Sequence, residues 1–179
     1  MLIKEAKKIT GSLTRTTKMP GLSYSLPAWE CKTGSKLRKI KNSVCASCYA
    51  LKGNYVRYSA IKAAQYVRLK SLTNPLWVEA MVTQIKKQTF FRWHDAGDIQ
   101  SMDHLNKIFE VCRLTPDIQH WMPTREAQFL SQIENPTEDV PQNLIIRMSS
   151  HMIDQAAVKF WPWTSTVTSK GGASCPAPT

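Results

Sequence analysis

The chain has 179 residues and a mass of 20.3 kDa, which favours one domain, because single domains commonly hold about 100–200 residues. Hydrophobic residues make up 42% and charged residues 21% of the chain. That composition excludes wholesale disorder, and the 7 glycines and 10 prolines exclude a collagen-like chain or a linker. No apolar run approaches the roughly 20 residues of a membrane span. The first residues also lack the apolar core of a signal peptide, so we expect a cytosolic protein with no membrane contact.

Basic residues are concentrated in the N-terminal part. Residues 1–72 contain 15 Lys and Arg against 2 Asp and Glu, whereas residues 73–179 contain 9 against 11. The densest basic stretch consists of Lys32, Lys36, Arg38, Lys39 and Lys41. A face of this charge favours nucleic acid or an acidic partner. The alternative is a solvated basic face that has no dedicated partner.

We expect a single domain, 1–179, made of two parts. Residues 1–57 form a basic, irregular, cysteine-bearing layer, because they are rich in turn formers such as Pro20-Gly21 and Gly53-Asn54. Three of the five cysteines lie there. In a reducing cytosol, cysteines are better explained as metal ligands or core thiols than as disulfides. Residues 58–179 alternate between helices and strands.

The alternation in the second part predicts an α/β fold. Hydrophobic spacing and capping residues predict helices at 59–72, at 75–88 after an Asn74 cap, from the Ser101 cap to Pro116, at 126–134 and, as a short turn of helix, at 152–158. β-rich runs predict strands at 89–94, 118–122 and 143–148, with a last extended run at 160–167. Strands that alternate with helices pair in parallel through right-handed crossovers. We therefore expect a small parallel sheet or partial βα barrel, with the cysteine-bearing layer covering one end.

Four cysteines form the strongest chemical signal. Cys45 and Cys48 are three residues apart, so a tight turn can direct both at one metal or cluster. Cys31 precedes them, and Cys175 is followed by Pro176, a Cys-Pro pair found at cluster ligands of bacterial ferredoxins. We therefore predict a metal or cluster site at Cys31, Cys45, Cys48 and Cys175. The alternatives are a redox-active pair at Cys45 and Cys48, or inert thiols.

The spacing favours an iron–sulfur cluster over zinc. Zinc sites commonly pair two CxxC turns, whereas this chain has one CxxC and two isolated cysteines. The preferred cofactor is thus a [4Fe-4S] cluster, with Zn as the alternative. The aromatic neighbours Trp29, Tyr49 and Tyr55 would shield a cluster from water. Cys112 lies on the apolar face of a predicted helix, and we expect it to be a core thiol.

Polar residues follow each predicted strand, where parallel α/β folds form their sites. They are His94, Asp95 and Asp98; Thr124, Arg125 and Glu126; Ser149, Ser150 and His151; and Thr164 and Ser165. His94 with Asp95 or Asp98 could form an oriented general base, and Arg125 could bind a carboxylate or phosphate. We therefore predict His94, Asp95, Asp98 and Arg125 as a catalytic rim. The alternative is structural: Asp98 and Ser101 cap a helix, Glu126 starts another, and the histidines pack. His104 is expected to be a solvated helix residue.

Several strings match a known pattern. The segments Pro20–Ala28, Cys45–Ala50, Phe91–Asp98 (FRWHDAGD) and Pro123–Glu126 resemble the phage family known as gene product 88. The resemblance spans most of the chain and implies a viral protein in the host cytosol with a cysteine-bound metal. It implies no substrate, because the family has no established biochemical function. Longer members carry extra cysteines near the C-terminus, whereas this chain has only Cys175 there.

A fainter likeness, to radical S-adenosylmethionine enzymes, concerns the scaffold alone. Those enzymes also join a cysteine loop to a βα partial barrel, but their motif is CxxxCxxC. Here position 41 is Lys, and the upstream cysteine is Cys31. The spacing therefore departs from that motif, and the likeness implies a shared scaffold without radical chemistry.

The sequence leaves three functional hypotheses. The first is a viral [4Fe-4S] protein with a structural or electron-transfer role, which requires a host or phage redox partner. The second is a zinc-stapled module whose basic N-terminal face binds nucleic acid. The third is an enzyme that uses the metal or cluster beside the His94, Asp95, Asp98 and Arg125 rim.

Overall fold

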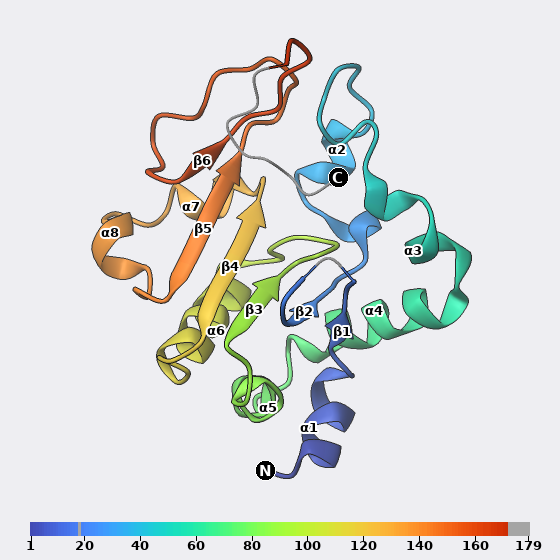
Figure 1. Ribbon diagram of the computed structural model, residues 1–179, viewed down its shortest axis with the longest axis vertical. Coiled ribbons are helices and arrows are strands. Elements are labelled where there is room, and N and C mark those ends of the chain that lie inside the picture. The colour runs from blue at the N-terminus through green and yellow to red at the C-terminus, as the bar shows by residue number, and fades with distance from the viewer. Residues whose placement is uncertain (18, 172–179) are drawn as a thin grey trace.

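A computed structural model describes residues 1–17 and 19–171 and contains one open six-stranded sheet with the order β1-β2-β3-β4-β5-β6 (Figure 1). All neighbouring pairs are parallel except β1 with β2, which is antiparallel. The strands are β1 Thr14–Arg15, β2 Leu22–Tyr24, β3 Phe90–Trp93, β4 Gln119–Thr124, β5 Leu144–Ser149 and β6 Thr164–Ser165. The expected α/β architecture, an open and mostly parallel sheet consistent with a partial barrel, is confirmed.

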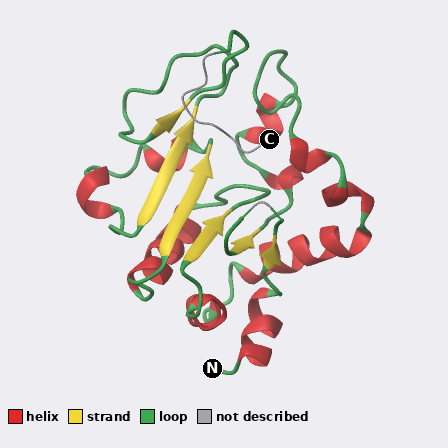
Figure 2. Cartoon of the chain, viewed as in Figure 1, coloured by secondary structure: helices red, strands yellow, loops and turns green. Residues whose placement is uncertain are grey.

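The helices differ widely in length (Figure 2). The α-helices are α1 Ile3–Thr10, α2 Gly34–Leu37, α3 Asn54–Arg57, α4 Ser59–Ser71, α5 Trp77–Ile85, α6 Met102–Arg113, α7 Ala127–Leu130 and α8 Pro136–Asp139, and the 3-10 helices are η1 Ala28–Glu30 and η2 Tyr49–Leu51. None of the helices in the described residues is long and apolar enough to span a membrane. We call residues 27–58, which hold η1, α2, η2 and α3, the cysteine layer.

The two faces of the sheet have different surroundings. Side chains alternate between the two faces along a strand. Trp93, Met122 and Ile146 are therefore fully buried, whereas Trp121 and Ile145, which precede Met122 and Ile146 in sequence, are exposed on the other face. The buried face packs against α5 and α6 in one hydrophobic core. On the opposite face, where Trp121 and Ile145 are exposed, Figure 1 shows no helix of the described residues in front of β4 or β5.

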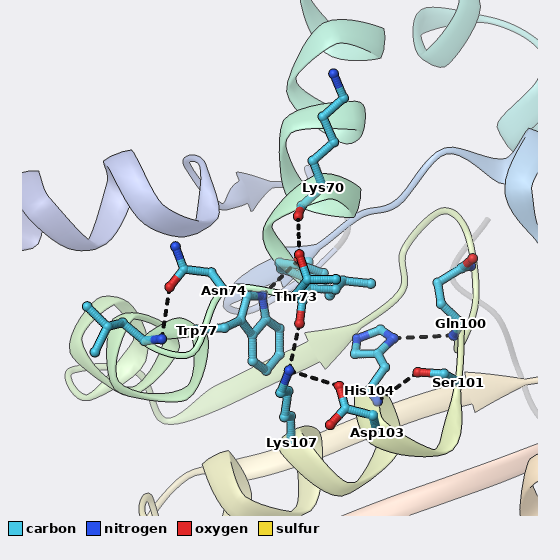
Figure 3. Close-up of polar contacts among 12 residues, drawn as sticks. Lys70, Thr73, Asn74, Trp77, Gln100, Ser101, Asp103, His104 and Lys107 are labelled. Atoms are coloured by element: carbon cyan, nitrogen blue, oxygen red, sulfur yellow. Dashed lines mark hydrogen bonds and ion pairs between the residues drawn. The ribbon is translucent and has the colours of Figure 1, made fainter.

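Polar contacts fix α6 beneath the sheet (Figure 3). Ser101 caps the helix, as predicted, because its hydroxyl accepts a hydrogen bond from the backbone N–H of His104 at 3.0 Å. Lys107 donates to the Leu72 carbonyl at 2.7 Å and pairs with Asp103 at 2.8 Å. These contacts join the end of α4 to α6. His104, expected in solvent, is 1% exposed, so that prediction was wrong.

Three helix predictions were wrong. Helix α5 begins at Trp77, not Pro75, because the Asn74 side chain accepts a hydrogen bond from Leu76 N and forms a turn instead of a cap. Helix α7 covers only Ala127–Leu130 of the expected 126–134. No helix forms at 152–158, where Asp154 has a left-handed φ of 63°.

The N-terminal part is more regular than expected. It contains α1, β1 and β2, and β2 forms part of the main sheet by pairing with β3. Gly21 permits this pairing, because a Cβ atom there would lie 2.1 Å from the carbonyl oxygen of Phe90. At the other end, the extended run at 160–167 contains only the two-residue strand β6.

A buried histidine links β3, β4 and α6. The indole N–H of Trp93 donates to His120 Nδ1 at 3.2 Å, so Nε2 carries the proton and donates to Thr115 Oγ1 at 3.0 Å. Thr115 in turn donates to the Val111 carbonyl at 2.7 Å. Burial lowers the pKa of His120 to about 4. The ring is therefore neutral in the folded protein over most of the accessible pH range.

This depressed pKa predicts acid sensitivity. Between the ordinary histidine pKa of about 6.5 and about 4, the unfolded chain binds a proton at His120 that the folded chain does not. The free energy of unfolding should thus fall as pH falls through this window, by about 1.4 kcal/mol per pH unit for this one group. We expect His120→Gln to be less stable at pH 7 and to show a shallower pH slope in urea titrations. An unchanged slope would contradict the assignment.

Candidate functional site

A cavity of about 200 Å³ lies between the cysteine layer and the carboxyl ends of β3, β4 and β5. The layer contributes Cys31, Gly34, Cys45, Cys48 and Tyr49 to its walls, and the strand ends contribute Arg92, His94, Asp98, Arg125 and Ser149. The structure therefore brings together three of the predicted cysteines with three of the predicted rim residues. In Figure 1, α2 of the layer lies near the end of the sheet to which the strand arrows point.

Short turns position the cysteines. Cys31 follows η1 directly, and the N–H of Cys48 donates to the carbonyl of Cys45 at 3.2 Å. The N–H of Val44 donates to the carbonyl of His151 at 2.9 Å, which ties this turn to the segment after β5. A Cβ atom on Gly34 would lie 3.6 Å from the sulfurs of both Cys31 and Cys45. Gly34 thus keeps the space between two thiols open.

The three thiols form no disulfide; Cys45 is buried, whereas Cys31 and Cys48 are half-buried. Burial raises the pKa of Cys31, and the charges of Asp98 and Glu126 and the neighbouring cysteines raise it further. Burial also raises the pKa of Cys45, while Arg125 opposes that shift. Cys31 and Cys45 are therefore protonated in the free protein, and a metal that bound them would release protons.

The described residues contain no group of three or more His, Cys, Asp or Glu side chains that could hold a metal ion as arranged. The three cysteines surround the cavity rather than converge on one point. A single zinc ion needs its ligands about 2.3 Å from one centre. A four-iron cluster takes one thiolate at each iron and so accepts thiolates spread around a larger body.

The other two cysteines differ from these three. Cys112 lies on α6 and is fully buried in the core under the sheet, as predicted. Cys175, the expected fourth ligand, lies outside the described residues. Its role stays a prediction.

Of two buried carboxyl groups, Glu126 joins the layer to the end of β4, and Asp98 joins the loop after β3 to the end of β4. Asp98 accepts hydrogen bonds from Thr124 Oγ1 at 2.6 Å and from the N–H of Arg125 at 3.0 Å. Glu126 accepts from the N–H and the hydroxyl of Thr33 at 2.8 and 2.7 Å. Burial, with the charge of Glu126, raises the pKa of Asp98 to about 7. Thr33 lies two residues after Cys31, so Glu126 positions that cysteine.

Asp95 has a structural contact instead of a place on the cavity wall. Its carboxylate accepts a hydrogen bond from Tyr55 at 2.8 Å, and its backbone carbonyl accepts one from Tyr49. Nearby, the N–H of Leu26 donates to the carbonyl of Ala96 at 2.8 Å. The Asp95 loop therefore anchors the cysteine layer. Neither tyrosine was predicted to have this role, because partners 40 and 46 residues away leave no local pattern.

His94 lines the cavity without a carboxylate partner. It is 3% exposed, has a left-handed φ of 58°, and neither ring nitrogen makes a hydrogen bond. Burial, His104 and Arg92 hold the pKa of His94 well below its ordinary value, so the ring is neutral. The expected pairing of His94 with Asp95 or Asp98 is therefore wrong, since both carboxyl groups bind other donors.

Two arginines give the cavity a positive wall. Arg92 and Arg125 line it, and the Nε atom of each is buried without a hydrogen-bond partner. Arg92 was not predicted, because it lies within a strand rather than after one. An anionic group in the cavity would supply the missing acceptors.

A family model described as gene product 88 matches residues 1–169. The chain belongs to the gene product 88 family. This confirms the resemblance drawn from the FRWHDAGD and CASCYA strings. No curated protein and no solved structure matches the chain, so the likeness to the radical S-adenosylmethionine scaffold has no support. Membership of the gene product 88 family assigns no chemistry to the cavity.

The variant Glu126→Gln tests the contact between Glu126 and Thr33, which joins the cysteine layer to the strand ends. Glu126→Gln keeps the shape of the side chain but places an amide N–H₂ among the donors of Thr33 and Gln128. The cost of such a buried mismatch is about 1–3 kcal/mol. We expect that loss in the free energy of unfolding, measured by urea titration. Glu138→Gln, on the exposed face of α8, is the control and should change stability little.

Proposed function

We propose that this gene product 88 protein binds one [4Fe-4S] cluster through Cys31, Cys45 and Cys48, with Cys175 as the fourth thiolate. The observation that carries the proposal is one cavity lined by three cysteines, Cys31 from the turn after η1 and Cys45 and Cys48 from a second turn. Four thiolates are the usual ligand set of such a cluster. The proposal places the protein in a reducing cytosol, where these thiols stay free of disulfides.

The walls of the cavity suit an anionic cluster. Arg92 and Arg125 supply positive charge, which offsets that of thiolates and cluster sulfides. Apolar residues of the layer pack around the cysteines, among them Ala28, Ala50 and Leu51. Limited water access and nearby charge are the two means by which a protein sets a cluster's potential. When bound, the cluster would store or pass single electrons or hold the layer in place.

A second candidate function is catalysis beside the cluster. His94, Asp98 and Arg125 line the same cavity as the cysteines, which favours a reaction centre over a purely structural metal. The neutral His94 ring can donate and accept hydrogen bonds. Arg125 can bind a carboxylate or phosphate. Asp95 has no such role in this proposal, because it anchors Tyr49 and Tyr55.

The direct test is metal analysis after anaerobic purification. We expect a brown protein with a broad absorption band near roughly 400 nm and about four iron atoms and four sulfide ions per chain. About one zinc per chain and no colour would favour the zinc alternative and contradict the cluster. A metal-free protein after reconstitution with iron and sulfide would contradict both.

Single cysteine variants assign the ligands. We expect Cys31→Ser, Cys45→Ser and Cys48→Ser each to lose most of the iron and the visible band, since each removes one cluster thiolate. Cys175→Ser tests the predicted fourth ligand in the same assay. Cys112→Ala is the matched control, because that thiol lies in the core under the sheet, and it should keep its iron. Equal iron loss in the control would mean that the assay reports stability instead of ligation.

Gly34 offers a test that leaves every thiol in place. A Cβ atom there would lie 3.0 Å from Cys31 Cβ and 3.6 Å from two sulfurs. Because Gly34 begins α2 with no positive φ, alanine suits its backbone. We expect Gly34→Ala to keep the far-UV circular dichroism spectrum, while cluster content falls at least twofold and Gly34→Val loses more. The neighbouring Ser35→Ala should keep full iron content.

A further inference from the structure

The uncovered face of the sheet carries aromatic and basic side chains in register. Arg92 on β3 pairs with Trp121 on β4, and Trp121 pairs with Ile145 on β5. One step further along, Pro123 pairs with Arg147. Neighbouring strands lie about 4.8 Å apart, so these side chains form two short rows across the sheet. A shallow depression follows them and is also lined by Phe90 and Gln119.

This face is exposed where a parallel sheet is normally covered. Trp121 is 39% exposed, and Phe90 and Ile145 are each 46% exposed. Parallel sheets in α/β proteins bury both faces beneath helices, but Figure 1 shows no helix in front of β4 or β5. Aromatic rings left in water at the centre of a sheet mark a surface that something else covers.

The charge of the face identifies the partner's chemistry. Arg92 and Arg147 are its charged groups, and no Asp or Glu lines the depression among the described residues. The guanidinium of Arg92 lies 4.7 Å from the centre of the Trp121 ring, a cation–π arrangement. Exposed aromatic rings flanked by arginines suit a ligand with planar groups joined by negative charges. Single-stranded nucleic acid has this composition.

We propose that the helix-free face of β3, β4 and β5 binds single-stranded nucleic acid. Unpaired bases stack on Trp121 and Phe90, while Arg92 and Arg147 contact the phosphates. A duplex would not bind in this way, because its bases are already stacked on each other. DNA and RNA strands should bind alike, since neither stacking nor phosphate charge depends on the 2′-hydroxyl.

The face leads directly to the cysteine cavity. Arg92 lines both the depression and the cavity, and Pro123 and Ser149 continue the same strands into the cavity wall. A strand held on Trp121 would therefore lie next to the site at the carboxyl ends of the strands. The binding proposal does not depend on the cluster, because none of the cysteines that the structure describes lines the depression.

Fluorescence anisotropy with labelled oligonucleotides tests the proposal on the purified full chain. Probes of about 12 nucleotides, oligo-dT and oligo-rU, cover the usual range of single-strand sites, and a duplex of the same length is the comparison. We expect both single strands to bind at low salt and the duplex to bind more weakly. Trp121→Ala should weaken single-strand binding roughly 5- to 100-fold, while Trp121→Phe keeps most of it. Arg147→Gln should make the salt dependence shallower by about 0.7 in log–log slope.

Controls separate this face from other basic surfaces. Arg113→Gln removes an arginine that also lies over an aromatic ring, Phe109, but on α6 beneath the opposite face, and it should bind as the wild type does. The circular dichroism spectrum of each variant shows whether it folds, and its iron content shows whether it holds the cluster. A variant that passes both tests and binds less oligonucleotide has lost only the binding face. Should Trp121→Ala fail to fold, Trp121→Phe and the exposed Arg147→Gln still test the face.

Three results would overturn the proposal. The first is no anisotropy change with either single strand at low salt. The second is binding that survives Trp121→Ala but is lost in Lys36→Gln/Lys39→Gln, which would assign binding to the basic cysteine layer instead. The third is a dimer in light scattering that Trp121→Ala converts to a monomer without any oligonucleotide binding. In that case a second copy of the chain covers the face.

Discussion

Asp98 and Glu126 lie buried at the junction between the cysteine layer and the strand ends, and their need for hydrogen-bond donors fixes that junction. A carboxyl group removed from water is costly unless donors surround it. The donors come from the Thr33 turn, from the end of β4 and from the loop after β3. Three segments distant in sequence therefore have to meet at one place. Cys31 reaches the cavity because Thr33, two residues further along the chain, is fixed there.

The parallel sheet explains why the cavity forms at this edge. Parallel strands present all of their carboxyl ends on one side, so His94, Arg125 and Ser149 follow β3, β4 and β5 into a common space. The cysteine layer covers the cavity on the side away from the strands with small residues, among them Ala28 and Ala50. Small side chains and Gly34 leave room that larger ones would fill. Covered thiols, positive charge and a neutral histidine thus lie together in one enclosure.

Much of the second half of the fold could be predicted from the sequence, because each element carries its own local signal. The β-rich runs near 90, 119 and 144 became β3, β4 and β5, and Ser101 caps α6. Strand β2 could not be predicted, since three residues between turns show no periodicity and depend on pairing with β3. The length of β6 was overestimated for a related reason, because this two-residue strand depends on its pairing with the end of β5.

For the candidate site too, local sequence features could be predicted and long-range contacts could not. Cys31, Cys45, Cys48, His94, Asp98 and Arg125 were predicted because residue type and position after a turn or strand are local features. Their hydrogen-bond partners were not. Asp95 or Asp98 was expected to orient His94, but Tyr55 donates to the Asp95 carboxylate, and the Thr124 hydroxyl and the Arg125 N–H donate to Asp98. Thr33, Tyr49 and Tyr55 have roles that depend entirely on residues far along the chain.

The cysteine layer is attached to the sheet mainly by side-chain hydrogen bonds, and the buried apolar cluster at the contact consists of the small residues Ala28 and Ala50 of the layer and Ala96 of the loop after β3. Little apolar surface is buried there compared with the tryptophan-rich core around Trp77 and Trp93. Segments of this kind open locally at a lower free energy than the core, which stays folded. We therefore expect the layer to open locally while the sheet stays folded, so that its backbone amides exchange with solvent before those of β4 and β5. Local opening of this kind would let a ligand reach the cavity without unfolding the core.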